Sequence, residues 1–204
     1  MTEDEARAHV LSDVSRETSE RLDIYQALLL KWQRTINLVA PKTLDVIWSR
    51  HFLDSAQLWD IAGNVSGSWL DLGSGGGFPG LVIAAIAAEK SPDLTVTLVE
   101  SDIRKCGFLR ETARAMGIKV NILSRRIDQI PQQNAQVVSA RALSQLDQLV
   151  AYATPHLAQG AIMLFPKGAT YQDELETLDP DWQTKVDVVP SQTDPSAVIL
   201  RFHN

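Results

Sequence analysis

The chain has 204 residues, a net charge of −6 and one cysteine, with 45% hydrophobic and 22% charged residues. This composition is ordinary for a soluble globular protein, and the length fits one domain with a substantial core. A single cysteine excludes an intramolecular disulfide. The acidic N-terminus and the short apolar runs exclude a signal peptide and a membrane span, so we expect a cytoplasmic protein.

The first third of the chain has a helical pattern. Within 16–34, apolar residues recur at the spacing of one helix face, and Pro41 interrupts the pattern. Thr43 is a residue that can cap a second helix, which we expect to run to about Trp59. Residues 63–67 then predict a loop.

From residue 68 onward, the pattern alternates between strands and helices. It predicts, in order, strand 68–72, helix 78–89, strand 94–100, helix 102–116, strand 119–123, strand 136–140, helix 144–157, strand 160–165, helix 170–178, and strands 183–190 and 196–203. This alternation predicts an α/β fold with a doubly wound, mostly parallel sheet. The last two strands lie too close together for a helical crossover, so we expect one to run antiparallel. Residues 1–66 would be a helical extension packed on the domain 67–204, the two forming one structural unit.

The most informative segment is the run from Asp71 to Gly80, which reads Asp-Leu-Gly-Ser-Gly-Gly-Gly-Phe-Pro-Gly and follows the first strand. Glycines between a buried strand and a helix let a ligand approach the backbone, because no Cβ is in the way. The amides at the N-terminus of the new helix can bind anionic or hydroxyl oxygens. The segment therefore predicts a site for a nucleotide-type cofactor.

Glu100 ends the next predicted strand. A carboxylate at that place can accept hydrogen bonds from both ribose hydroxyls of an adenosine cofactor. The alternative is a surface acid that caps the helix starting near Asp102. The glycine run one strand earlier favours the ribose role.

Two cofactor classes fit the glycine run. A dinucleotide fingerprint matches at Gly75, Gly77 and Gly80, but it places Pro79, which lacks an amide donor, inside the phosphate-binding turn. The acid-x-Gly-x-Gly-x-Gly pattern that starts at Asp71 is typical of S-adenosylmethionine-dependent methyltransferases, which we favour.

Parallel strands place their carboxyl ends at one edge of a sheet, where ligands bind. We therefore expect four segments to meet there: residues 73–77 after the first strand, Glu100 after the second, residues 127–128 after the third and Arg141 after the fourth.

Charge is unevenly distributed along the chain. Residues 1–23 contain seven acids and three bases, and residues 173–194 contain seven acids and one base. Residues 100–126 contain seven bases and three acids. Such a run is usually a solvated helix face, yet it leaves room for a local basic surface on an acidic protein.

Several separated motifs resemble one family, the bacterial small-subunit ribosomal RNA guanine-N7 methyltransferases, also called the glucose-inhibited division protein B family. The resemblance spans about residues 28–168. It rests on Lys31-Trp32 with Asn37-Leu38, Arg50-His-Phe-Leu-Asp-Ser55, Asp71 to Gly80, Leu98-Val-Glu-Ser101 with Lys105 and Phe108-Leu109, Arg126-Ile-Asp128, Ala140-Arg-Ala142 and Lys167-Gly168.

The resemblance implies a class I, Rossmann-like methyltransferase that uses S-adenosylmethionine and modifies 16S rRNA in the small ribosomal subunit. No Cys/His cluster has metal-ligand spacing, so we expect no metal site, and we expect a monomer. The resemblance assigns adenine contacts to Ile127 and Asp128 and a cofactor- or substrate-facing role to Arg141. The family often has Val-Glu and Ser-Arg-Ala at these places. The implied cofactor-binding residues are Asp71, Gly73, Gly75, Gly77, Phe78, Glu100, Ile127, Asp128 and Arg141.

Guanine N7 carries a free lone pair, so its methylation needs positioning and electrostatic complementarity rather than a general base. His51 and Asp54 lie three apart, on one face of the predicted helix. They would be a local hydrogen-bonded pair or, together with Arg141, part of the methyl-transfer site. The candidate RNA contacts are Lys31, Arg34, Arg50, Arg104, Lys105, Arg125, Arg126 and Lys167.

Three other functions remain open from the sequence. These are a methyltransferase acting on a small molecule, an NAD-dependent oxidoreductase on a similar sheet, and a non-catalytic nucleotide-binding module. The net acidity favours the first of them.

Overall fold

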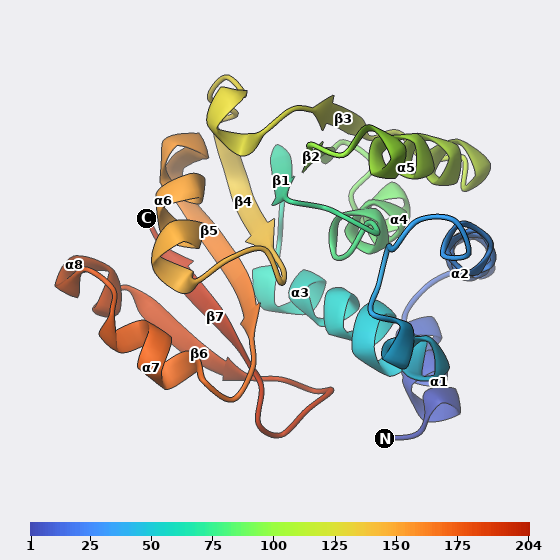
Figure 1. The fold of residues 1–204 in the computed structure, drawn as a ribbon, viewed down its shortest axis with the longest axis horizontal. Helices are drawn as coiled ribbons and strands as arrows, with labels where there is room; N and C mark the ends of the chain where they lie inside the picture. Colours follow the sequence, from blue (N-terminus) through green and yellow to red (C-terminus); the bar gives the residue numbers. More distant parts are fainter.

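The computed structural model describes all 204 residues, with helices on both faces of a seven-stranded sheet (Figure 1). The first third holds α1 (Glu3–Ser12), α2 (Arg16–Trp32), the 3₁₀-helix η1 (Pro41–Val46), the π-helix η2 (Trp48–Leu53) and α3 (Asp54–Ala62). The remainder holds β1 (Ser68–Leu72), α4 (Gly80–Lys90), β2 (Thr95–Glu100), α5 (Ile103–Ala115), β3 (Asn121–Ser124), η3 (Ile127–Gln129), β4 (Ala135–Ala140), α6 (Leu146–Ala153), η4 (Thr154–His156), β5 (Leu157–Lys167), α7 (Tyr171–Glu176), α8 (Pro180–Gln183), β6 (Val186–Pro190) and β7 (Val198–His203).

The strands lie in the order β3-β2-β1-β4-β5-β7-β6. Strands β1 to β5 are parallel, whereas β7 runs antiparallel to both of its neighbours, β5 and β6. The predicted doubly wound, mostly parallel sheet is confirmed, and so is an antiparallel strand at its end. The order reverses between β1 and β4, the place where such sheets bind ligands.

The core lies on the two faces of the sheet because side chains alternate along each strand. On one face, Trp69 and Leu98 pack under helices that include α4 and α5. On the other face, Leu70 and Leu72 pack under α6 and the α7 region. In Figure 1, α4, α5 and α2 accordingly lie on one side of the sheet, and α6 and α7 on the other.

The N-terminal residues belong to the core of the sheet rather than to a separate layer. Val10 of α1 and Leu22 of α2 share one hydrophobic cluster with Leu81 of α4 and Trp69 of β1. The carboxylate of Glu3 accepts hydrogen bonds from the amides at positions 48 and 49, where η2 begins. The shared cluster supports our proposal that residues 1–66 and 67–204 fold as one unit.

The helical stretch predicted from Thr43 to about Trp59 is confirmed, but it is not one regular α-helix. This segment is divided into η1, η2 and α3, and α1 was not predicted at all. Ala40 precedes η1 as its N-cap residue, and the hydroxyl of Thr43 bonds to the Ala40 carbonyl and to His51 instead. A π-helix is rare and often occurs at functional sites, because its wider turn redirects side chains.

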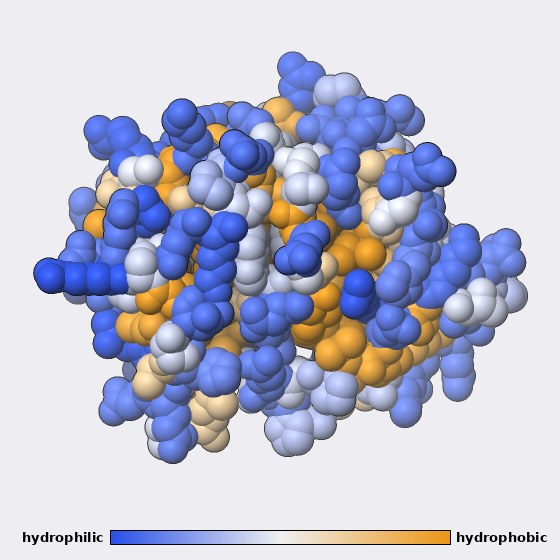
Figure 2. Space-filling view, turned by 180° about the vertical axis from the view of Figure 1, so that it is seen from behind, coloured by the Kyte–Doolittle hydropathy of each residue, from blue (hydrophilic) through white to orange (hydrophobic).

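The predicted helix 144–157 is also too long. Pro155 cannot donate the backbone bond that an α-helix needs, so α6 ends at Ala153 and a short 3₁₀-helix leads into β5. None of the helices combines the length and hydrophobicity needed to cross a bilayer. Seen from behind, the molecule shows mostly hydrophilic residues with smaller apolar areas between them (Figure 2).

Candidate active site

A cavity of about 820 Å³ lies at the edge of the sheet where the parallel strands end. Its volume is within the range of sites for cofactors and drug-sized ligands. The four segments expected at this edge all line it, so that prediction is confirmed. The lining residues among the predicted cofactor contacts are Gly73, Gly75, Phe78, Glu100, Ile127, Asp128 and Arg141.

The loop after β1 leaves space where a ligand can approach its backbone. At Gly75, φ is +54°, and a Cβ would find no atom nearer than the Gly73 carbonyl oxygen, 3.7 Å away. Below the loop, the hydroxyl of Tyr25 donates a hydrogen bond to the carbonyl of Gly76 at 2.6 Å. Burial raises the pKa of Tyr25 well above its usual value, so the hydroxyl keeps its proton. Helix α2 thus fixes the position of the glycine loop.

Asp71 and Gly77 do not line the cavity, so the structure does not support their prediction as cofactor contacts. Asp71 is fully buried on the α4 face, where its carboxylate accepts hydrogen bonds from Ser139 Oγ at 2.8 Å and from the Gly80 amide at 3.2 Å. Burial raises its pKa to about 6. A Cβ on Gly77 would lie 2.6 Å from a methyl carbon of Leu81. Both residues shape the loop from behind.

Glu100 joins the two loops at the cavity. Its Oε2 accepts a hydrogen bond from the Gly75 amide at 2.9 Å, and its Oε1 accepts one from the Asp102 amide at 2.8 Å. A carboxylate offers about four acceptor positions, so two remain for ligand hydroxyls. The capping alternative does not hold, because the side chain of Asp102 itself caps α5 by accepting from the amides of Arg104 and Lys105.

Ile127 and Asp128 line the cavity from η3, the turn after β3. The Nε of Arg126 lies 3.3 Å from Asp128 Oδ1, and both of these side chains are largely exposed. The Asp128 carboxylate therefore keeps its second oxygen available for another donor.

Arg141 lies just after β4 and connects three parts of the chain. Its Nη1 donates to Asp54 Oδ2 at 3.1 Å and to the Arg50 carbonyl at 2.9 Å. Its Nη2 lies 2.8 Å from His51 Nδ1. The guanidinium carbon lies 5.2 Å from the centre of the Phe78 ring, and only 15% of the side chain is exposed. Arg141 is thus held in one orientation at the cavity.

These contacts define the protonation of His51. A guanidinium only donates, so Nδ1 accepts from Arg141 and the ring proton is on Nε2. Nε2 then donates to Thr43 Oγ1 at 2.7 Å, and Thr43 donates to the Ala40 carbonyl at 2.7 Å. Burial, followed by the charges of Arg141 and Arg50, lowers the pKa of His51 to about 3. His51 is therefore neutral near pH 7.

His51 and Asp54 do not bond to each other, so the local pair considered from the sequence does not form. They bind the same guanidinium instead. Asp54 Oδ1 also accepts from Gln57 Nε2 at 3.1 Å and from Thr193 Oγ1 at 3.2 Å. The structure thus brings the three residues assigned to the methyl-transfer site into one network.

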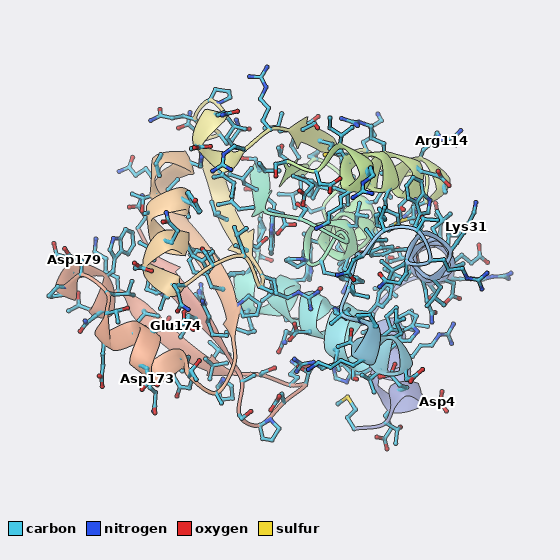
Figure 3. All side chains as sticks on the ribbon, viewed as in Figure 1. Asp4, Lys31, Arg114, Asp173, Glu174 and Asp179 are labelled. Carbon is cyan, nitrogen blue, oxygen red and sulfur yellow. The ribbon has the colours of Figure 1, made fainter.

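The candidate RNA contacts fall into two groups. Arg50, Lys105, Arg125, Arg126 and Lys167 line the cavity, whereas Lys31, Arg34 and Arg104 do not. In Figure 3, Lys31 of α2 and Arg114 of the basic helix α5 lie on one side of the molecule. The acidic residues Asp173, Glu174 and Asp179 lie on the other side.

Lys167, one of the candidate RNA contacts, is largely buried and already has partners inside the protein. Its Nζ donates to Glu174 Oε2 at 2.7 Å and to the Ser144 carbonyl at 3.1 Å, and only 9% of the side chain is exposed. Because its charge is already paired inside the protein, Lys167 holds α7 to the loop after β4, and this pairing disfavours the predicted phosphate contact.

Sequence reasoning missed the wall formed by the loop between β6 and β7. Asp194 of this loop lines the cavity, and so does Lys42 of η1. The amide of Gln192 donates to Gln57 Oε1 at 3.0 Å, which ties the loop to α3. The only sequence signal for this tie is Gln57, a polar residue at a position that proves to be fully buried. No group of three or more His, Cys, Asp or Glu side chains could hold a metal ion.

The chain is similar in sequence to one family of proteins and in fold to a solved methyltransferase. The model of the family described as rRNA small subunit methyltransferase G matches residues 18–197. Ribosomal RNA small subunit methyltransferase G of Jannaschia sp. (strain CCS1) is 60% identical over 99% of this chain and 96% of its own. The protein of that name from Ruegeria sp. (strain TM1040) is 48% identical over 97% and 96% of the two chains. A crystal structure of a SAM-dependent methyltransferase from Aquifex aeolicus has a TM-score of 0.59 at 13% identity, over 87% of this chain and 97% of that one.

Proposed function

The chain belongs to the rRNA small subunit methyltransferase G family, and we propose that it transfers a methyl group from S-adenosylmethionine to N7 of a guanine in 16S rRNA. The observation that carries the proposal is that the glycine loop, Glu100 and Arg141 all line the same cavity, at the switch point of the sheet. The family match over most of the chain favours ribosomal RNA over a small molecule as the substrate. It also favours S-adenosylmethionine over a dinucleotide as the cofactor.

The residues at the cavity fit S-adenosylmethionine. Gly75 leaves room at its backbone, Glu100 keeps acceptor positions for ribose hydroxyls, and Asp128 has an oxygen for the exocyclic amine of adenine. When bound, the cofactor supplies an electrophilic methyl group on a sulfonium. The protein's own task is to hold the acceptor nitrogen in line with that group and to exclude water.

The network around Arg141 suits a reaction without proton removal. Guanine N7 attacks through its lone pair, so a general base is unnecessary. His51 is neutral with both ring nitrogens bonded inside the protein, and Asp54 is fully engaged. We therefore assign both as positioning residues that keep the guanidinium of Arg141 in place.

The basic residues at the cavity are the proposed phosphate contacts. Arg125 and Lys105 have no ion-pair partner, whereas Arg126 and Arg50 each face a carboxylate. We propose that the protein acts as a monomer in the cytoplasm, where these side chains orient the RNA strand so that one base enters the cavity.

One glycine substitution tests the cofactor site. We expect Gly75→Ala to raise the Kd for S-adenosylhomocysteine by about tenfold or more, because the new Cβ enters the space at the loop backbone. The positive φ adds a folding cost of about 1–2 kcal/mol. Isothermal titration calorimetry with S-adenosylhomocysteine and thermal unfolding measure the two effects.

The matched control is Gly117→Ala. Gly117 has φ of +66° and no atom within 4 Å of its Cβ position, but it follows the end of α5, away from the cavity. We expect the same stability loss with unchanged affinity. Equal affinity of the two variants would contradict our account of the loop.

Methyl transfer from labelled S-adenosylmethionine tests the function as a whole. The substrates are small ribosomal subunits from cells that lack this gene and, separately, a pool of free nucleosides. We expect label in 7-methylguanosine of 16S rRNA and none in the free pool. Label in the free pool alone would favour a small-molecule substrate, and calorimetric binding of NAD instead of S-adenosylhomocysteine would favour an oxidoreductase.

A further inference from the structure

Arg50 of η2 and Asp194 of the loop between β6 and β7 meet at the cavity wall. Arg50 Nη1 lies 3.4 Å from Asp194 Oδ2, a long contact for an ion pair. Both residues line the cavity, and their side chains are 50% and 35% exposed. Such a pair keeps hydrogen-bonding capacity for a ligand, unlike the compact network around Arg141.

Asp194 is held in place by its own loop and by α3. Its Oδ1 accepts from the amide of Ser196 at 2.9 Å and from the Ser196 hydroxyl at 2.7 Å. These bonds lower the pKa of the carboxyl, so it is ionised near pH 7. The neighbouring Thr193 bonds to Asp54, which also binds Arg141. The position of Asp194 is therefore coupled to the network around Arg141.

The other carboxylates at the cavity have different partners. Asp54 is only 16% exposed and accepts from Arg141, Gln57 and Thr193. Glu100 binds two loop amides, and Asp128 lies on η3 beside the residues assigned to adenine. Asp194 is more exposed than Asp54, and its Oδ2 has only the long contact with Arg50, so this oxygen is available for the target base.

Guanine presents two adjacent donors, N1–H and N2–H, beside the acceptor O6. A carboxylate accepts from both donors, and a neighbouring guanidinium donates to O6. Adenine presents an acceptor at N1 and a donor at N6, so the same pair opposes it. Contacts on this edge also leave N7 free to react.

We propose that Asp194 and Arg50 form the guanine-recognition pair of the methyl-transfer site, with Asp194 accepting from N1–H and N2–H and Arg50 donating to O6. This inference rests on the proposed function, because it concerns the base that enters the same cavity. It names the residues that select guanine over other purines.

Asp194→Asn tests the pair without removing the loop contact. The amide oxygen still accepts from Ser196, but the amide nitrogen now faces a guanine donor. The control is Asp187→Asn, an exposed carboxylate of β6 that pairs with His203 and does not line the cavity. The substrates are small subunits reconstituted with 16S rRNA that carries guanosine or inosine at the modified position, since inosine lacks only the N2 amine.

We expect wild-type protein to prefer guanosine over inosine by about tenfold in kcat/KM, since one hydrogen bond to a charged group is lost. Asp194→Asn should lower kcat/KM on guanosine by about 10- to 100-fold and reduce the preference to about threefold or less. Its Kd for S-adenosylhomocysteine should match that of wild type, and Asp187→Asn should change neither value.

An unchanged preference in Asp194→Asn would overturn the inference, whether or not the rate falls, because a merely structural role lowers both rates alike. Weakened binding of S-adenosylhomocysteine would overturn it as well, since the effect would then reach the cofactor. Failure of the proposed function has a different signature, namely no transfer by wild-type protein to the guanosine subunits.

Discussion

Arg141→Lys is expected to lower methyl transfer to 16S rRNA by about 100-fold or more. Lysine keeps the charge but cannot bind Asp54, His51 and the Arg50 carbonyl together, as the guanidinium does. The cavity wall formed by these groups would lose its orientation relative to Phe78. Single-turnover transfer of a labelled methyl group measures the rate.

The same substitution is expected to lower the free energy of unfolding by about 3 kcal/mol, because it leaves Asp54 and His51 without their shared donor. Arg16→Lys is the control, since Arg16 is 92% exposed and pairs only with Glu20. A rate within threefold of wild type, in a variant that folds, would remove Arg141 from the methyl-transfer site.

Glu100→Gln is expected to raise the Kd for S-adenosylhomocysteine by about 10- to 100-fold. Two amides, of Gly75 and Asp102, point at the carboxylate, and an amide side chain must present its own donor to one of them. The substitution also removes acceptor positions proposed for the ribose hydroxyls. Calorimetry with S-adenosylhomocysteine measures the affinity.

The control for this prediction is Glu111→Gln, on the helix that follows β2 but not at the cavity. It should bind S-adenosylhomocysteine as tightly as wild type. If Glu100→Gln also bound it as tightly, the carboxylate would serve the loop geometry alone, and the ribose assignment would fail.

The sheet and the cofactor edge could be predicted from the sequence because both depend on local patterns. Apolar periodicity gives strands and helices, and parallel strands bring their carboxyl ends together whatever the loop details. The role of Asp71 could have been predicted too. The alternation along β1 puts Asp71 on the same face as Trp69, beneath α4 rather than in the cavity.

The hydrogen-bond network around Arg141 could not be predicted from local sequence patterns. Thr43, His51 and Arg141 are joined by hydrogen bonds across up to 90 positions in the chain. Apolar periodicity predicts a helix that contains His51, but it does not distinguish the π-helix η2 from an α-helix. Asp194 reaches the site only because β7 runs antiparallel and returns its loop to α3. Contacts of this kind depend on tertiary packing, which local propensities do not determine.

The central claim is tested most directly by mapping 7-methylguanosine in 16S rRNA from cells with and without this gene. We expect one 7-methylguanosine to be lost without the gene, to return with the wild-type gene, and to stay absent with the Arg141→Lys gene. An unchanged set of modified guanines in cells that lack the gene would contradict the proposed function.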